Sequence, residues 1–137
     1  MTIICYDGET IAADRQVTSD KTIVSFEKKI AKWDKGWYSV AGSECNEEPF
    51  TKWLIDREKF KPVGNFFAIY TEDKNVRLLD RSLVPYKAYV PWAIGSCDES
   101  IGAAIALMRI GYSAKQTCQE MCKYDITCGG KIDVVYV

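Results

Sequence analysis

Short apolar segments separated by turn signals dominate the first third of the chain. Residues 2–6 and 9–13 predict two strands of a hairpin, because the Asp7-Gly8 pair between them is a strong tight-turn signal. Residues 14–20 are polar and predict a turn. Further strands are expected at 22–26, 29–33 and 37–41, and the last two flank a turn at Asp34-Lys35-Gly36.

A helix is predicted over roughly residues 46–58. Asn46 can cap it, Pro49 falls in the first turn where proline is tolerated, and an apolar stripe follows at Phe50, Trp53 and Leu54. Strands are then expected at 66–70, 76–79 and 84–90, and residues 91–95 lead into the next helix.

Two further helices and a final strand complete the pattern. The second helix follows the capping box Ser96-Cys97-Asp98-Glu99 and ends at Gly111, and the third begins at Ser113. Residues 131–137 predict the last strand. This order allows a two-sheet core with helices outside, although the hydrophobic pattern alone does not distinguish that layout from other α+β arrangements.

Composition limits the classes of protein that remain. A length of 137 residues predicts one domain with a real core. Eighteen basic and nineteen acidic residues give a net charge of −1, so nucleic acid is not expected as a partner. The apolar runs are short, so no membrane span is expected, and the strand-like start indicates no signal peptide and a cytoplasmic protein.

The six cysteines are expected to be reduced thiols, because a reducing compartment disfavours disulfides. Cys118 and Cys122 share a helix face, but the sequence has no second pair and no histidine to complete a metal site. We therefore expect buried thiols, with no metal and no cofactor.

The absence of histidine also restricts the catalytic chemistry, since Ser-His-Asp and Cys-His arrangements are excluded. Thr2 offers another route. If Met1 is removed, Thr2 carries both a hydroxyl that can attack a carbonyl and an α-amine that can take the proton.

A series of short motifs then occurs in order along the chain: Thr2-Ile3-Ile4, Ile11-Ala12-Ala13-Asp14, Lys28-Lys29-Ile30, Val40-Ala41-Gly42, Ala93-Ile94-Gly95-Ser96 and Asp125-Ile126-Thr127-Cys128-Gly129-Gly130. In this order the motifs resemble proteasome β-subunits and the bacterial HslV peptidase, which are N-terminal nucleophile (Ntn) hydrolases. The resemblance implies a single proteasome/HslV-like domain over residues 1–137, with a four-layer αββα sandwich. It also implies assembly into a ring and hydrolysis of unfolded polypeptide.

The resemblance assigns a role to each matching residue. Thr2 would be the nucleophile, and Lys29 would place a positive charge beside it, lowering the pKa of its hydroxyl and amine. Asp14 would pair with Lys29 and orient Thr2. Gly42 would donate its N–H to the developing oxyanion, and its alternative role is a tight turn. Val40 would line the first specificity pocket and favour apolar side chains.

Three more residues are supporting candidates under the same resemblance. Ser96 would assist catalysis, although the capping box also explains it. Asp125 and Cys128 would lie beside the nucleophile, or simply form the end of a helix. Family members that degrade folded proteins use a separate ATP-dependent unfoldase, and this sequence has no nucleotide motif.

Departures from the family pattern keep other functions open. Ile3 replaces a second threonine, Cys128 replaces a serine, and the gap between Gly42 and Phe66 has room for one helix, so the first helical layer is reduced. A catalytically inactive assembly or interaction protein on the same fold is one alternative. A small-molecule amidase is another.

Overall fold

The computed structural model describes residues 2–19, 22–95 and 98–137. Its first hairpin is formed by β1 (Ile4–Tyr6) and β2 (Thr10–Ala13), which pair antiparallel as predicted. β10 (Trp92–Ile94) pairs with β1 on one side, and β11 (Asp133–Tyr136) pairs with β2 on the other. The result is a four-stranded antiparallel sheet in the order β10-β1-β2-β11.

The turn predicted over residues 14–20 is wrong, because β3 (Gln16–Ser19) is a strand paired with β4 (Thr22–Phe26). Its polar residues are accommodated by contacts distant in sequence. The Gln16 side chain donates to the carbonyl of Ile126 at 2.7 Å, and the Thr18 hydroxyl donates to the carbonyl of Thr127 at 3.2 Å.

A second sheet contains five antiparallel strands in chain order: β5 (Ile30–Trp33), β6 (Gly36–Gly42), β7 (Phe66–Glu72), β8 (Asn75–Leu79) and β9 (Tyr86–Lys87). The predicted β5–β6 hairpin is confirmed. The strand expected at 84–90 shortens to two residues; Pro85, which has no N–H to donate, immediately precedes it. Residues 91–95, expected to lead into a helix, include β10.

One α-helix of the described chain covers this second sheet. α1 (Glu47–Asp56) follows a 3₁₀ turn, η1 (Glu44–Asn46), and buries the predicted stripe of Phe50, Trp53 and Leu54 against the sheet. The capping role predicted for Asn46 is wrong. Its backbone is already helical (φ −83°, ψ −14°), and its side chain instead exchanges hydrogen bonds of 2.8 Å with the backbone of Val63.

Two helices, α2 (Asp98–Arg109) and α3 (Ala114–Tyr124), cover the four-stranded sheet. Ala104 and Met108 of α2 are buried there. Ser113 and Gln116 form a capping box at the start of α3. The capping box predicted at 96–99 lies partly outside the described residues.

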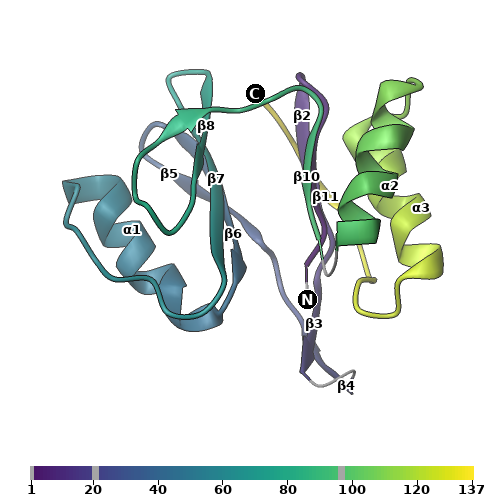
Figure 1. Ribbon diagram of the computed structural model, residues 1–137, viewed down its shortest axis with the longest axis horizontal. Coiled ribbons are helices and arrows are strands. Elements are labelled where there is room, and N and C mark those ends of the chain that lie inside the picture. Colours follow the sequence, from purple (N-terminus) through teal and green to yellow (C-terminus); the bar gives the residue numbers. More distant parts are fainter. Residues whose placement is uncertain (1, 20–21, 96–97) are drawn as a thin grey trace.

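The two sheets pack on each other through a core that includes Ile4, Ile11, Ile69 and Leu78. Figure 1 shows α1 on the outer side of one sheet and α2 with α3 on the outer side of the other. The α+β class predicted from the sequence is therefore confirmed. None of the helices in the described ranges is long and apolar enough to cross a membrane.

Asp7 connects the first hairpin to α3. One carboxylate oxygen accepts from the amides of Glu9 and Thr10, and the other accepts from the Thr10 hydroxyl and, at 2.8 Å, from the amide of Ala114. Burial alone would raise the pKa of Asp7, but these hydrogen bonds outweigh burial and lower the pKa.

We therefore predict that Asp7→Asn lowers the free energy of unfolding by about 1–3 kcal/mol at pH 7. Because the folded-state pKa of Asp7 is lowered, this contribution is complete above the unfolded pKa of about 3.9 and is lost as pH falls through the folded value. Urea unfolding of both proteins at several pH values should show the difference shrinking in acid. Asp34→Asn, at an exposed turn, is the control. A difference that is constant with pH would contradict the assignment.

Candidate active site

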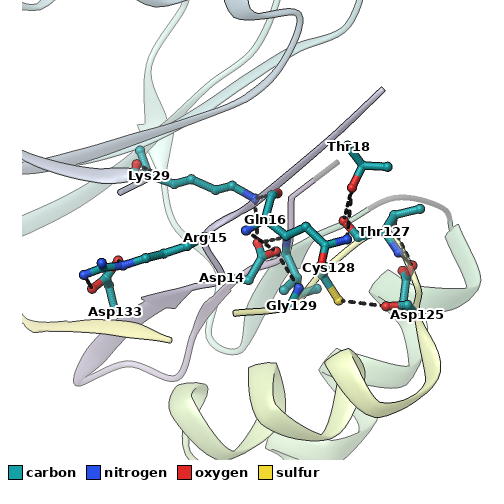
Figure 2. Close-up of polar contacts among 12 residues, drawn as sticks. Asp14, Arg15, Gln16, Thr18, Lys29, Asp125, Thr127, Cys128, Gly129 and Asp133 are labelled. Carbon is teal, nitrogen blue, oxygen red and sulfur yellow. Dashed lines mark hydrogen bonds and ion pairs between the residues drawn. The ribbon is translucent and has the colours of Figure 1, made fainter. Parts of the chain in front are cut away.

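Asp14, which follows β2, is fully buried, and its carboxylate accepts hydrogen bonds from four separate donors. Its Oδ1 accepts from the amide of Ile3 at 3.0 Å and from Lys29 Nζ at 2.8 Å. Its Oδ2 accepts from the amides of Gly129 at 3.0 Å and Gln16 at 3.3 Å. One carboxylate thus joins residues of the first quarter of the chain to Gly129 near its end, and Figure 2 shows Lys29 and Gly129 meeting at Asp14.

The Lys29 ammonium is the charged partner of this carboxylate. Its side chain is only 9% exposed, and Nζ also donates to the carbonyl of Gln16 at 2.6 Å. An ion pair this deeply buried persists because both groups are paired and hydrogen-bonded. Lys28, the preceding residue, is exposed. The pairing of Asp14 with Lys29 is therefore present as the sequence analysis expected.

A cavity of about 540 Å³ opens beside this pair. Its lining includes Thr2, Lys29, Val40 and Gly42. The structure thus brings together four of the residues that the sequence analysis assigned to nucleophile, cation, specificity pocket and oxyanion donor. Thr2 is half-buried, and its neighbour Ile3 donates its amide to Asp14, which fixes the start of the chain beside the ion pair.

Gly42 ends β6 at the edge of the cavity with φ +105°. A Cβ at this position would overlap the backbone of Asn65 on the neighbouring chain segment, so a side chain is excluded by both conformation and space. The positive φ and the close approach of Asn65 therefore both account for glycine here.

Asp125 and Cys128 occupy the segment after α3. Asp125 accepts from the Ser100 hydroxyl at 3.1 Å and from the Thr127 hydroxyl at 2.5 Å. Cys128 is buried, and its sulfur contacts the carbonyl of Asp125 at 3.5 Å. A hydrogen bond with Cys122, together with burial, raises the pKa of the Cys128 thiol far above its usual range. Neither residue is among the described residues that line the cavity, and Ser96 lies outside the described residues.

Gln16 and Gly129 are site residues that the sequence analysis did not assign. The backbone of Gln16 contacts both members of the ion pair, and its buried side chain holds the 126–127 segment through Ile126. Gly129 donates to Asp14, and its carbonyl accepts from the amides of Arg15 and Gln16. No local pattern signals Gln16, because its neighbours Arg15, Thr18 and Ser19 are polar too.

An ion pair between Arg15 and Asp133 adds a further connection beside the site. Arg15 forms two hydrogen bonds to the Asp133 carboxylate, at 2.7 and 2.8 Å, and these lower the pKa of Asp133. The pair ties the residue after Asp14 to β11 (Figure 2).

Comparison with solved structures places this geometry among known folds. HslV from Trypanosoma brucei superposes with a TM-score of 0.70 at 18% identity, covering 99% of this chain and 98% of that one. This is the fold of HslV. BPH from Thiobacillus denitrificans is similar too, with a TM-score of 0.70 at 13% identity over 100% of this chain and 97% of BPH. Its complex with epoxomicin gives 0.69 at 13% identity, over 100% and 98%.

The likeness to HslV covers the whole chain but lies at the level of structure. No family model and no curated protein matches the sequence. The resemblance to HslV inferred from short motifs is thus supported by the fold, which the two chains share despite their low sequence identity.

The buried ion pair gives a direct prediction about stability. Lys29→Met leaves the Asp14 carboxylate buried without its cation, so the free energy of unfolding should fall by about 3–5 kcal/mol. Lys28→Met, at the exposed neighbouring position, should change it by less than about 0.5 kcal/mol. Denaturant unfolding of the two variants measures both values. Equal losses would show that the ion pair does not stabilise the fold.

Proposed function

We propose that this chain is a threonine-type endopeptidase subunit of the Ntn-hydrolase type, in which Thr2 becomes the nucleophile after removal of Met1. The observation that carries the proposal is the shared cavity of Thr2, Lys29 and Gly42, directly beside the Asp14–Lys29 ion pair. The fold would be a single four-layer αββα domain over residues 1–137, with α1 as a reduced first helical layer.

The reaction uses both groups of the N-terminal threonine. Thr2 Oγ1 attacks the carbonyl carbon of the scissile peptide bond, and the α-amine of Thr2 takes the hydroxyl proton. The same amine returns the proton to the leaving nitrogen, which leaves an acyl-enzyme ester. A water molecule activated by the amine then hydrolyses the ester and regenerates Thr2.

Lys29 and Gly42 lower the barrier of these steps. The Lys29 ammonium is held in place by Asp14. Its positive charge stabilises the ionised hydroxyl of Thr2 and disfavours a second positive charge on the Thr2 amine, so the amine is kept neutral. Gly42 would donate its N–H to the oxyanion, a contact worth about 3 kcal/mol when well placed. Val40 would line the pocket for an apolar substrate side chain.

The supporting residues would act by position. Asp125 and Cys128 hold the turn that presents the Gly129 amide to Asp14, so their contribution would pass through the ion pair. Ser96 is retained as a supporting residue from the sequence motif. No metal or organic cofactor is required by this mechanism.

We further propose self-association into a ring that encloses unfolded polypeptide substrates in the cytoplasm, with a separate ATP-dependent unfoldase as partner. The structural likeness to HslV over the whole chain supports this. The order of the motifs supports it too, because it resembles that of ring-forming proteasome and HslV subunits. The complex of BPH with epoxomicin supports a ligand site on a chain of the same fold.

A catalytically inactive assembly protein is the second candidate, and Cys128 is the observation that favours it. Its sulfur contacts a carbonyl of its own turn and lies outside the residues that line the cavity, so it would orient Thr2 poorly. Loss of hydrolysis in a processed chain would support this alternative.

The first prediction from this mechanism concerns the hydroxyl. Thr2→Ala should lower peptide hydrolysis by about 10³-fold or more, because no other hydroxyl can carry the free α-amine. Thr2→Ser should retain hydrolysis, and Thr22→Ala, on exposed β4, should leave it unchanged. A panel of fluorogenic peptides and circular dichroism measure rate and folding. Equal rates for wild type and Thr2→Ala would refute the assignment.

The second concerns Met1. In the intact chain the Thr2 nitrogen is a peptide amide without a basic lone pair, whereas removal of Met1 creates an amine of pKa about 7.7–8.0. We expect hydrolysis to rise in proportion to the fraction of chains lacking Met1, which a cleavable N-terminal fusion can vary. Intact mass and peptidase rate are measured on the same samples. Full activity in a preparation that uniformly retains Met1 would rule out the mechanism.

A further inference from the structure

A cluster of possible metal ligands lies behind the ion pair, on the side of α3. The side-chain ligand atoms of Asp14, Cys122 and Cys128 all lie within 4.8 Å of one another. They come from three segments: the end of β2, the last turns of α3 and the segment after α3. Asp14 and Cys128 are buried and Cys122 is half-buried, so the cluster extends from the interior toward the surface.

The donor set suits zinc. Zinc binds thiolate sulfur at about 2.3 Å and carboxylate oxygen at about 2.0–2.2 Å in tetrahedral geometry, which separates its ligand atoms by less than about 4 Å. The three atoms here need to approach by about an ångström at most to reach that geometry. Two soft thiols with one carboxylate favour zinc over calcium or magnesium, which prefer oxygen ligands alone.

Charge balance also permits a divalent ion at this buried position. The Asp14 carboxylate is already neutralised by Lys29. A zinc ion that binds two thiolates displaces two thiol protons to the solvent, so the net charge of the buried site does not change. The penalty for burying an uncompensated charge is therefore avoided.

We propose that Asp14, Cys122 and Cys128 form a zinc site. Cys118 is the other thiol on α3, but its side chain is hydrogen-bonded to the free thiol of Cys5 and is not part of the three-ligand cluster. Because Asp14 already accepts four hydrogen bonds, a bond to zinc competes with Lys29 and Gly129 for the carboxylate. Zinc bound here therefore inhibits the proposed peptidase. This inhibition rests on the proposed function, whereas the binding does not.

The test uses the full chain, reduced with a phosphine, and cobalt(II) as a spectroscopic substitute for zinc. Wild type should bind one ion per chain with a thiolate-to-cobalt charge-transfer absorption, and zinc should displace the cobalt. Cys122→Ala should lose this absorption and bind at least about tenfold more weakly, since losing a direct ligand costs no less than losing an outer-shell partner. Cys122→Ser serves if the alanine variant is unstable. Cys45→Ala, at an exposed free thiol, should bind as wild type does.

Reduced wild type that binds no cobalt or zinc at micromolar concentration would overturn the site. So would Cys122 variants that bind with the affinity and absorption of wild type. Peptidase rates are measured with and without zinc, and each variant is compared with its own zinc-free rate. These rates separate the proposed zinc site from the proposed peptidase function. Metal binding in a chain without peptidase activity would contradict the proposed function and leave the zinc site standing.

Discussion

The buried ion pair between Asp14 and Lys29 is the interaction on which the arrangement of the site depends. A carboxylate that is completely removed from water must have its charge compensated and its lone pairs filled. Asp14 meets both requirements with one ammonium and three backbone amides. Satisfying this single group therefore fixes the start of the chain, the turn between β2 and β3, and the segment after α3.

The two sheets supply the rigid frame around that pair. The four-stranded sheet contributes Asp14 through β2, and the five-stranded sheet contributes Gly42 through β6, while Lys29 immediately precedes β5. Each sheet is covered on its outer face by helices, so both strand layers are held by packing on two sides. Over the five-stranded sheet, α1 is the one α-helix of the described residues, and its large aromatic side chains fill the interface: Phe50 and Trp53 stack, and both rings contact Tyr70.

Features set by nearby residues could be predicted from the sequence. The two hairpins follow from Asp7-Gly8 and Asp34-Lys35-Gly36, and the buried face of α1 follows from the spacing of its apolar residues. β3 could not be predicted, because its polar Gln16 is satisfied by a carbonyl 110 positions away. The capping role predicted for Asn46 was wrong for the same reason, since its side chain is hydrogen-bonded to Val63, in the segment between α1 and β7.

In the candidate site, too, some residues could be predicted from local sequence and others could not. The order of short motifs was enough to expect Thr2, Lys29 and Gly42 close together, and all three line the cavity. The role of Gly129 and the approach of Cys122 and Cys128 to Asp14 depend on how the chain end returns to β2, which no local pattern encodes.

The proposed mechanism joins the hydroxyl and the α-amine of Thr2 in one reactive centre. Epoxomicin, the compound bound to BPH, provides the most direct measurement. The chain is incubated with epoxomicin as two preparations, one lacking Met1 and one retaining it, and each is digested and mapped by mass spectrometry. We expect an adduct on Thr2 in the preparation that lacks Met1 and none in the other. A fully processed, folded chain that forms no adduct, or one that forms it at another residue, would contradict the Thr2 mechanism.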